Sequence, residues 1–593
     1  MPAARAGRSD QSRPAWAAAI LPGMLTRDLA LATLARDPFD IVVIGGGITG
    51  AGVALDAASR GYSVALVEQA DYASGTSSRS SKLVHGGLRY LQKFDLGLVR
   101  EALLERQLMV KLAPHLVRPL QLVVPAFDGA RPDRLTGIGL NMYDVMAAPS
   151  LRARRNARRS TGEPGEADWS PARHRVISGE EVTDLLPALA SRNPTGGYLF
   201  YDCQADDARL VLTVLGEAER FGAICANRLQ VIGLGRDDDL GAGVTVRDFE
   251  SGEEFPIRAD NVVNATGVWA DRIRPEELYS EAEVPRIAPS RGTHIILAHD
   301  DLPLIAGVIV PAGGSRSIFA LPWLGRSLVG TTDNNYDGDI DHVQPSGQDV
   351  DYLLSAVNDF FGTALTSGDL AGAYAGVRPL ISSGDSRKSV DISRKAELYE
   401  TSSGLITITG GKLTTWRRMA KMAVDRLVER DGRQAPCRTH EIPLGAPAVA
   451  DQLPRVEGVR DDAYGQLAAR YGHAAERVLA MAQTRGELAQ PLVPGRPDLL
   501  AEAPFSARYE QARTVADVLL RRTRLGLLAA RELTDPGGEV ALRVARAMAP
   551  ELGWDEARTE REVQRFGAEA TIEGLVGSEA PDSGAIASEA VTE

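Results

Sequence analysis

The feature that most constrains the fold is a short apolar run that leads into three spaced glycines. Residues 40–50 read Asp-Ile-Val-Val-Ile-Gly-Gly-Gly-Ile-Thr-Gly and contain the pattern G-x-G-x-x-G. Together with the residues that follow, the pattern predicts a strand at 39–44, a glycine turn, a helix at 48–60 and a second strand at 63–68. Such a β-α-β unit indicates an α/β fold with a parallel sheet.

The three glycines have distinct expected roles in binding a dinucleotide. Gly45 permits the tight turn, Gly47 lets the backbone approach a pyrophosphate, and Gly50 lets the helix pack closely on the strand. The helix N-terminus offers free N–H groups to the phosphates. Glu68 ends the second strand, where a carboxylate can bind ribose hydroxyls. A lone glycine triplet is often only a turn, but the complete ordered set predicts a dinucleotide site.

Three later segments favour FAD as that dinucleotide. Residues 74–90 form a loop dense in Ser and Thr that can wrap a pyrophosphate, although such a loop taken alone could simply be solvated. Predicted strands at 261–265 and 405–409 end at glycines, which let the backbone approach the same cofactor. The cofactor-binding candidates in these segments are Thr76, Ser77, Ser81, Lys82, Leu83, Thr266, Gly267, Gly411, Lys412, Leu413 and Thr414.

The chain has 593 residues, 44% of them apolar, so it can bury a large core and is too long for one domain. The predicted fold is α/β, with a Rossmann-like FAD-binding domain, an interleaved and mainly β substrate-binding domain, and an α-helical C-terminal domain. The expected divisions are a flexible N-terminal arm at 1–37, an oxidoreductase region at 38–432, a helical domain at 433–569 and a disordered tail at 570–593. Within the oxidoreductase region, we expect FAD-binding segments at about 38–110, 200–290 and 380–432, and substrate-binding segments at about 111–199 and 291–379.

Charge and cysteine content exclude several functional classes. The net charge of −13 argues against nucleic-acid binding. The three cysteines, at 203, 225 and 437, have neither metal-ligand spacing nor a disulfide pattern, so we expect no metal site. No segment has about 18 uninterrupted apolar residues, which predicts that any contact with a membrane is peripheral.

Motifs spread over residues 38–430 resemble those of the FAD-dependent glycerol-3-phosphate dehydrogenases, in the D-amino-acid-oxidase-like flavoprotein superfamily. They read IGGGITGAGVALDAASRG, GTSSRSSKLVHGGLRYL, YDCQADDARLV, NVVNATGVWAD, RGTHI, GTTD, GVRPL, ISR and GGKLTTWR. The resemblance implies non-covalent FAD, oxidation of sn-glycerol-3-phosphate to dihydroxyacetone phosphate, and electron transfer to a membrane quinone, either menaquinone or ubiquinone. It also implies a cytoplasmic enzyme attached peripherally to the inner face of the cell membrane. The oligomeric state stays open, with a homodimer as one alternative.

Carried over position by position, the resemblance also implies a set of substrate-binding residues, namely Arg89, Tyr90, His294, Arg378, Arg394 and Lys412. Of these, His294, Lys412 and Arg378 are the expected catalytic residues. The chain departs from the family pattern at Trp416, where a tyrosine is usual. It departs again after Arg394, where Lys395 and Ala396 replace an acidic residue and an aromatic residue or histidine.

The chemistry of these residue types fits the expected substrate. A phosphate dianion needs several charge-assisted donors, and the planar guanidinium of arginine supplies them, although most arginines are only surface ion-pair partners. Oxidation of an alcohol needs a hydride acceptor and a base. The cofactor provides the acceptor, and His294 is the first candidate for the base because imidazole titrates near neutral pH. Alternatively, His294 only hydrogen-bonds the substrate and His85 is the base. Lys412 could stabilise negative charge on the reduced flavin or hold the substrate.

Alternative functions remain at this stage. A glycerol-3-phosphate oxidase would pass electrons to oxygen, and an amino-acid oxidase of the same superfamily would need only one arginine for its carboxylate substrate. A catalytically silent flavin-binding scaffold is the alternative of another class. Finally, residues 152–159 contain five arginines, which could bind anionic lipid or form a solvated loop.

Overall fold

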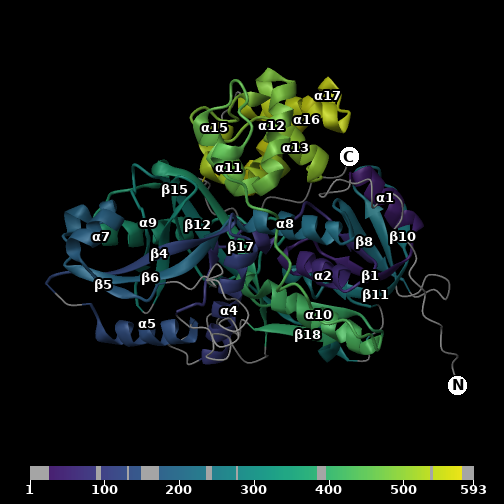
Figure 1. The fold of residues 1–593 in the computed structure, drawn as a ribbon, viewed down its shortest axis with the longest axis horizontal. Coiled ribbons are helices and arrows are strands. Elements are labelled where there is room, and N and C mark those ends of the chain that lie inside the picture. Colours follow the sequence, from purple (N-terminus) through teal and green to yellow (C-terminus); the bar gives the residue numbers. More distant parts are fainter. Residues whose placement is uncertain are drawn as a thin grey trace, which may run out of the picture.

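The computed structural model describes residues 26–88, 95–129, 132–147, 172–235, 243–275, 278, 280–314, 316–382, 395–534 and 538–576. Figure 1 shows two β-rich parts side by side, with a layer of helices above them formed by the C-terminal part of the chain. The architecture confirms the predicted class, in which α/β and mainly β parts are interleaved along the chain and a helical region follows them.

A mostly parallel sheet carries the glycine fingerprint. Its order is β18-β19-β11-β1-β2-β7, with bounds β1 Phe39–Ile44, β2 Val64–Val67, β7 Ile224–Ala226, β11 Ala259–Asn264, β18 Ala396–Glu400 and β19 Ile406–Gly410. Strand β1 pairs in parallel with both β2 and β11. The antiparallel β18 lies at one edge. The carboxyl ends of the central strands therefore meet at one edge of the sheet, where this fold binds ligands.

Alternate residues of β1 serve different cores, because successive side chains of a strand point to opposite faces. Ile41 and Val43 pack with helices α2 (Ile48–Ser59), α8 (Asp207–Arg220) and α10 (Trp416–Arg430). Val42 and Ile44 pack on the other face against α1 and a small antiparallel sheet. The bounds of these elements are α1 Arg27–Arg36, β8 Leu229–Leu234, β9 Val244–Asp248 and β10 Glu254–Ile257.

A second, larger sheet forms the other β-rich part. Its order is β16-β12-β15-β14-β13-β4-β6-β3, with β17 added on β12 and β5 added on β6. The bounds are β3 Leu83–Val84, β4 Val117–Ala126, β5 Arg175–Ser178, β6 Gly196–Ala205, β12 Ile287–Ala298, β13 Gly307–Pro311, β14 Ser317–Trp323, β15 Arg326–Gly330, β16 Asn334–Asn335 and β17 Leu370–Ile381. The accompanying helices are α4 Leu96–Leu112, α5 Arg134–Ala147, α7 Gly179–Leu185 and α9 Gly347–Phe361.

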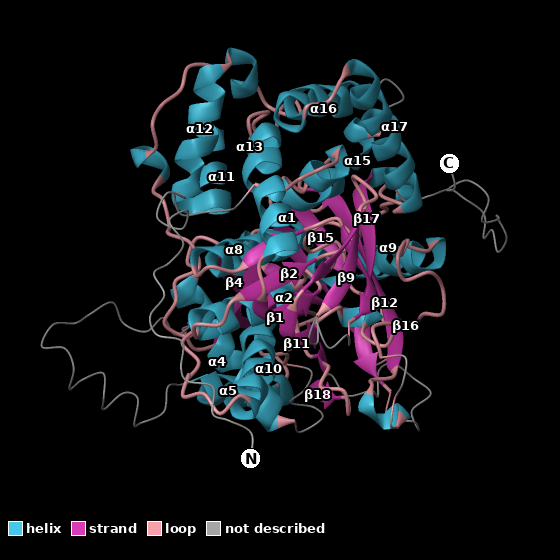
Figure 2. Ribbon diagram, turned by 90° about the vertical axis from the view of Figure 1, so that its right-hand side faces the viewer, coloured by secondary structure: helices cyan, strands magenta, loops and turns pink. Residues whose placement is uncertain are grey.

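The C-terminal helices lie over both sheets. They are α11 Asp461–Tyr471, α12 Ala475–Thr484, α13 Glu502–Tyr509, α14 Leu525–Leu528, α15 Ala530–Leu533, α16 Glu539–Leu552 and α17 Glu556–Ile572. In Figure 2, β17 lies close to this layer near α15, and the strand begins there, because Arg531 of α15 donates to the carbonyl of Leu370, its first residue. Both α14 and α15 contact β17. Residues 517–522 form a π-helical turn, which places several arginines on the side facing the FAD-binding sheet.

Two expected boundaries need correction. Residues 27–36, expected within a flexible arm, form α1, because Ala30 and Leu34 are fully buried and the Arg27 guanidinium pairs with Asp248 at 2.5 Å. Residues 570–576, expected within a disordered tail, are ordered, since α17 continues to Ile572 and Leu575 is buried. The arginine-rich residues 152–159 lie outside the described residues. Among the described residues, no helix has both the length and the apolarity needed to cross a bilayer.

Candidate functional site

A cavity of about 1790 Å³ lies along the carboxyl ends of the parallel strands and extends to the second sheet. This is more than a drug-sized ligand needs and suits an extended dinucleotide with a substrate beside it. Many predicted site residues line it, namely Gly45, Gly47, Glu68, Thr76, Ser77, Ser81, Leu83, His85, Thr266, Gly267, His294, Arg378, Gly411, Lys412, Leu413 and Thr414. Gly50 and the Lys82 side chain are predicted site residues that do not line it.

The glycine turn can form only because two of its residues have no side chains. Gly45 has a φ of +111°, and a Cβ there would lie 2.7 Å from the carbonyl oxygen of Ala265. A Cβ on Gly50 would lie 1.9 Å from the Gly45 carbonyl oxygen, so Gly50 is required for the packing of α2 against the turn. Gly47 precedes α2, and Gly47, Ile48 and Thr49 all line the cavity. This backbone cradle fits the pyrophosphate of FAD.

Glu68 is held rigidly at the end of β2. Its two carboxylate oxygens accept hydrogen bonds from the backbone N–H of Gly46 at 2.7 Å and of Ala70 at 2.8 Å. Burial raises the pKa of this carboxyl, and the two N–H groups oppose the rise. Because both oxygens keep further lone pairs, the carboxylate is oriented to accept hydrogen bonds from ribose hydroxyls.

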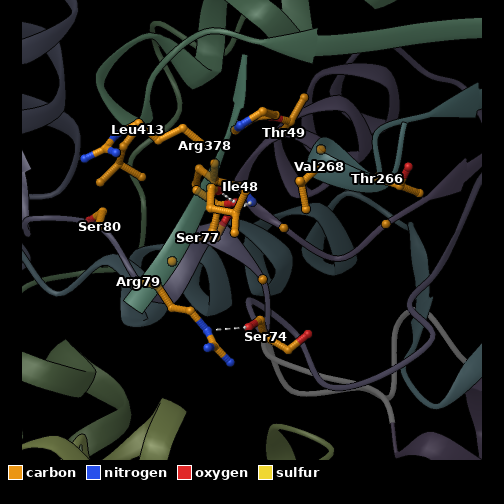
Figure 3. A pocket seen from close by; sticks show the side chains of 18 of the residues that line it. Ile48, Thr49, Ser74, Ser77, Arg79, Ser80, Thr266, Val268, Arg378 and Leu413 are labelled. Atoms are coloured by element: carbon orange, nitrogen blue, oxygen red, sulfur yellow. Dashed lines mark hydrogen bonds between the residues drawn. The ribbon is translucent and has the colours of Figure 1, made fainter. Parts of the chain in front are cut away.

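The hydroxyl-rich loop connects the cavity wall to three other segments. Ser77 Oγ accepts the N–H of Ile48 at 2.9 Å, and Thr76 Oγ donates to the Val377 carbonyl at 2.6 Å. Thr414 Oγ accepts the N–H of His85 at 3.1 Å. Figure 3 shows Ser77 and Ile48 close together, with Arg378 and Leu413 projecting from later parts of the chain toward the same space. The loop is therefore a fixed wall of the cavity.

His294 lies on β12 at the part of the cavity lined by the second sheet. It is 2% exposed, its Nε2 lies 2.8 Å from Ser81 Oγ, and its ring stacks on Tyr374 with the centroids 4.7 Å apart. Its Nδ1 has no hydrogen-bond partner among the described residues. Burial, followed by the nearby Lys82 and Arg378, holds the pKa of His294 well below its usual range. A neutral imidazole with one unengaged nitrogen can accept a proton.

Arg378 extends from β17 across β12 toward the same space. Its Nη2 donates to Thr331 Oγ1 at 3.1 Å and to the Thr332 carbonyl at 3.0 Å, and its Nη1 lies 3.5 Å from Asp333 Oδ1. Gly292 makes this path available, because a Cβ there would lie 2.5 Å from Arg378 Nη2. The side chain remains 21% exposed, so its guanidinium has surface left for an anionic ligand.

The remaining predicted residues fall into two groups. Lys412, at the end of the turn after β19, and His85 both line the cavity. Arg89, Tyr90 and Arg394 lie outside the described residues.

Lys82 takes part instead in a buried charge cluster behind the cavity. Its Nζ donates to Asp207 at 2.8 Å, and Arg524 donates to the same carboxylate at 3.1 Å. Ser80 also donates to Asp207, through its backbone N–H and its hydroxyl. Burial and then Arg524 lower the pKa of Lys82 to about 7, against the effect of Asp207. This cluster fixes the loop that carries Ser81, and thereby His294.

Sequence reasoning missed several residues that hold the site together. They are Arg79, Asp207, Gly292, Tyr374, Arg524 and Glu573. Asp207 was inside a recognised motif, YDCQADDARLV, and an acidic pair at the start of a helix was its only local signal. Nothing local distinguished Arg524 or Glu573 from other charged residues of the helical region.

The chain is similar to known proteins over nearly its whole length. A family model described as FAD dependent oxidoreductase matches residues 40–426, and one described as C-terminal domain of alpha-glycerophosphate oxidase matches residues 437–559. Glycerol-3-phosphate dehydrogenase 2 of Mycobacterium tuberculosis (strain ATCC 25618 / H37Rv) is 38% identical over 571 residues, covering 94% of this chain and 92% of the relative. Aerobic glycerol-3-phosphate dehydrogenase of Bacillus subtilis (strain 168) is 34% identical, covering 84% of this chain and 89% of the relative.

One solved structure matches with similar coverage. It is the glycerol-3-phosphate dehydrogenase from Bacillus halodurans complexed with FAD, with a TM-score of 0.72 and 29% identity. The match covers 94% of this chain and 99% of that chain.

Proposed function

Because the chain belongs to the family of FAD-dependent oxidoreductases, we propose that it oxidises sn-glycerol-3-phosphate to dihydroxyacetone phosphate. The observation that carries the proposal is the pairing of a neutral histidine and a partly exposed arginine on adjacent strands of the cavity wall. His294 is on β12 and Arg378 is on β17, which pair antiparallel. Relatives named glycerol-3-phosphate dehydrogenase, which align over most of this chain, support the same substrate.

In the proposed reaction, the protein binds the substrate and handles one proton. Arg378 holds the phosphate through its guanidinium. His294 takes the proton of the hydroxyl, and its hydrogen bond to Ser81 Oγ, at 2.8 Å from Nε2, holds the imidazole in place. When bound, the flavin of FAD supplies the hydride acceptor. Lys412 adds a positive charge to the same cavity. The predicted substrate residues Arg89, Tyr90 and Arg394 remain part of this proposal.

The test is an anaerobic titration of the purified holoenzyme with glycerol-3-phosphate, followed by the visible absorbance of the flavin. The proposal expects the flavin absorbance to bleach with glycerol-3-phosphate but not with glycerol at the same concentration. Bleaching by an amino acid alone would support an amino-acid oxidase instead. No bleaching by any of these compounds would support the silent scaffold.

We also propose that the electrons pass to a membrane quinone rather than to oxygen. Support comes from α5, whose outer side exposes Leu135 (77%), Ile138 (59%) and Val145 (68%). Thr136, on the same helix, lines the cavity. An exposed apolar row on a helix that also lines the cavity suits a site where an apolar quinone enters from the bilayer. The arginines at 152–159 follow this helix in the chain and would meet anionic headgroups.

Two measurements test this acceptor. In anaerobic stopped-flow, the reduced enzyme should be reoxidised much faster by a short-chain menaquinone or ubiquinone analogue than by oxygen, and the reverse order would indicate an oxidase. A variant with Leu135→Ser, Ile138→Ser and Val145→Ser should lose sedimentation with phosphatidylglycerol vesicles. Ile305→Ser, which alters another exposed apolar side chain, serves as the matched control. Equal sedimentation of both variants would rule out α5 as the docking surface.

A further inference from the structure

The last helix of the chain, α17, forms part of the wall of the cofactor cavity. Arg565, Ala568, Glu569, Ile572 and Glu573 all line the cavity. These residues are about 500 positions away from the glycine fingerprint in the sequence. We propose that α17 belongs to the FAD-binding site, where it covers the adenosine half of the bound cofactor and slows its release.

The position of α17 relative to Glu68 identifies the half of the cofactor concerned. The turn between β7 and β8 lies next to Glu68, since the Leu229 N–H donates to the Glu68 carbonyl at 2.8 Å. Arg228 in this turn pairs with Asp517 of the helical layer at 2.8 Å. Arg228 and Leu229 line the cavity together with the α17 residues. Because Glu68 is placed to bind the ribose, this end of the cavity fits the adenosine.

An ion pair fastens the end of α17 to the cofactor loop. Arg79 Nη1 lies 2.5 Å from Glu573 Oε2 and also donates to the Ala375 carbonyl at 3.2 Å, while its Nε donates to the Ser74 carbonyl at 3.3 Å. One side chain thus joins the loop, β17 and α17. Figure 3 shows Arg79 bonded to Ser74 on the side of the cavity nearest the yellow-green C-terminal ribbon.

The partners of Glu573 keep this carboxylate charged. Glu573 is 7% exposed, and its Oε1 lies 3.6 Å from His342 Nδ1. Although burial opposes ionisation, Arg79 and His342 hold the pKa of Glu573 at about 2. A buried ion pair that loses one charge leaves the other uncompensated, so removing the Glu573 charge should loosen this end of α17.

The rest of the helical layer is attached to the sheets by ion pairs that do not involve Glu573. Asp71 pairs with Arg521 at 2.5 Å and with Arg522, all three being buried. Asp207 binds Arg524, as described above. The end of α17 is held by the Arg79–Glu573 pair, by the contact of Glu573 with His342 and by a backbone bond from the Ala373 N–H to the Leu575 carbonyl at 2.8 Å. One turn earlier, Glu569 lies 3.9 Å from Arg521. Glu573→Gln therefore removes one attachment of α17 and leaves the Asp71 and Asp207 pairs intact.

The first experiment measures the rate of FAD release from the holoenzyme. Glu573→Gln keeps the shape of the side chain but removes its charge. Glu560→Gln is the matched control, because Glu560 is an exposed residue of the same helix that does not line the cavity. The release rate, followed as the rise of free-flavin fluorescence after dilution, should increase about tenfold for Glu573→Gln and stay unchanged for Glu560→Gln. An unchanged rate for Glu573→Gln, or an equal rise in both variants, would overturn the proposal.

A second pair of variants tests the cavity wall without disturbing the ion pair. Ala568 is exposed and lines the cavity, whereas Ala557 is exposed on α17 away from it. Ala568→Trp should fill the adenosine end and weaken the binding of FAD to the apoprotein, while Ala557→Trp should bind FAD as the unmodified chain does. Equal FAD affinity of the two variants would show that α17 does not contact the cofactor. These readouts do not depend on the substrate, so they stand apart from the test of the proposed reaction.

Discussion

Ser81 Oγ lies 2.8 Å from His294 Nε2, so a residue of the cofactor loop directly orients the candidate base on the second sheet. The bond occupies one imidazole nitrogen and leaves Nδ1 for another partner. A proton on Nε2 would make Nε2 the donor to Ser81 Oγ, whereas a proton on Nδ1 would make the Ser81 hydroxyl the donor.

The first prediction concerns this bond. Ser81→Ala should lower kcat about tenfold or more while the FAD content and KM change little, because the imidazole loses its orientation but not its place. His294→Ala should reduce turnover far more than it reduces the FAD content. Steady-state kinetics with flavin quantitation measures both effects, and a parallel loss of flavin and turnover would make His294 structural.

The second prediction concerns pH. The pKa of His294 is held well below 6.5 by burial, Lys82 and Arg378, while Ser81 and Tyr374 contact the ring without charge. A base of low pKa stays neutral as the pH falls, so kcat/KM should remain level down through pH 6.5 and decrease only at lower pH. Lys82→Met removes one cation near His294. It should therefore raise the pH at which kcat/KM begins to fall by about one pH unit. If kcat/KM of the unmodified enzyme already fell at pH 6.5, His294 would not be the base.

The third prediction tests Arg378 as the phosphate ligand. Arg378→Lys keeps the positive charge but loses the planar fork, and should lower kcat/KM for glycerol-3-phosphate about 10- to 100-fold. Activity with unphosphorylated glycerol at high concentration should hardly change, because that substrate has no phosphate to bind. A similar loss with both substrates would show that Arg378 acts on something other than the phosphate.

The fourth prediction uses a glycine. Gly292→Ala would place a methyl group 2.5 Å from Arg378 Nη2 and 2.6 Å from Thr331 Oγ1, so the arginine must move. We expect a raised KM for glycerol-3-phosphate with FAD binding intact. Gly347→Ala, at an exposed glycine with open space around it, should leave the KM unchanged, and a normal KM in Gly292→Ala would show that Arg378 need not cross β12.

The fifth prediction concerns stability. Asp71 is fully buried between Arg521 and Arg522, so Asp71→Asn removes one charged partner from each, although Arg521 keeps Asp517 at 2.5 Å and Arg522 keeps Glu510 at 3.7 Å. Breaking a buried pair in this way costs about 3–5 kcal/mol, and we expect a clear fall in the Tm. Asp462→Asn breaks an exposed pair with Arg460 and should leave the Tm within error. Equal Tm values for the two variants would mean that the helical layer is held mainly by apolar packing.

Local patterns predicted the cofactor half of the molecule well. The strand, turn, helix and strand around the fingerprint lie within two residues of their predicted bounds, because glycine conformation and the alternation of apolar residues act over a few positions. The family matches confirm the flavoprotein resemblance and FAD as the cofactor. Within the region predicted to be helical, residues 517–533 form a π-helical turn and two short helices, and no local pattern predicted these breaks.

The sequence by itself determined the glycine cradle, the acid at the end of β2 and the residue types that suit a phosphorylated alcohol. Only the tertiary structure decided which charged side chains form ion pairs with one another. Arg79 and Glu573 are 494 positions apart, and Asp207 and Arg524 are 317 apart. Neither pair has a local signal, because an ion pair depends on where the folded chain brings two side chains and how far it removes them from water. The position of α17 in the cavity wall depends on the same long-range packing.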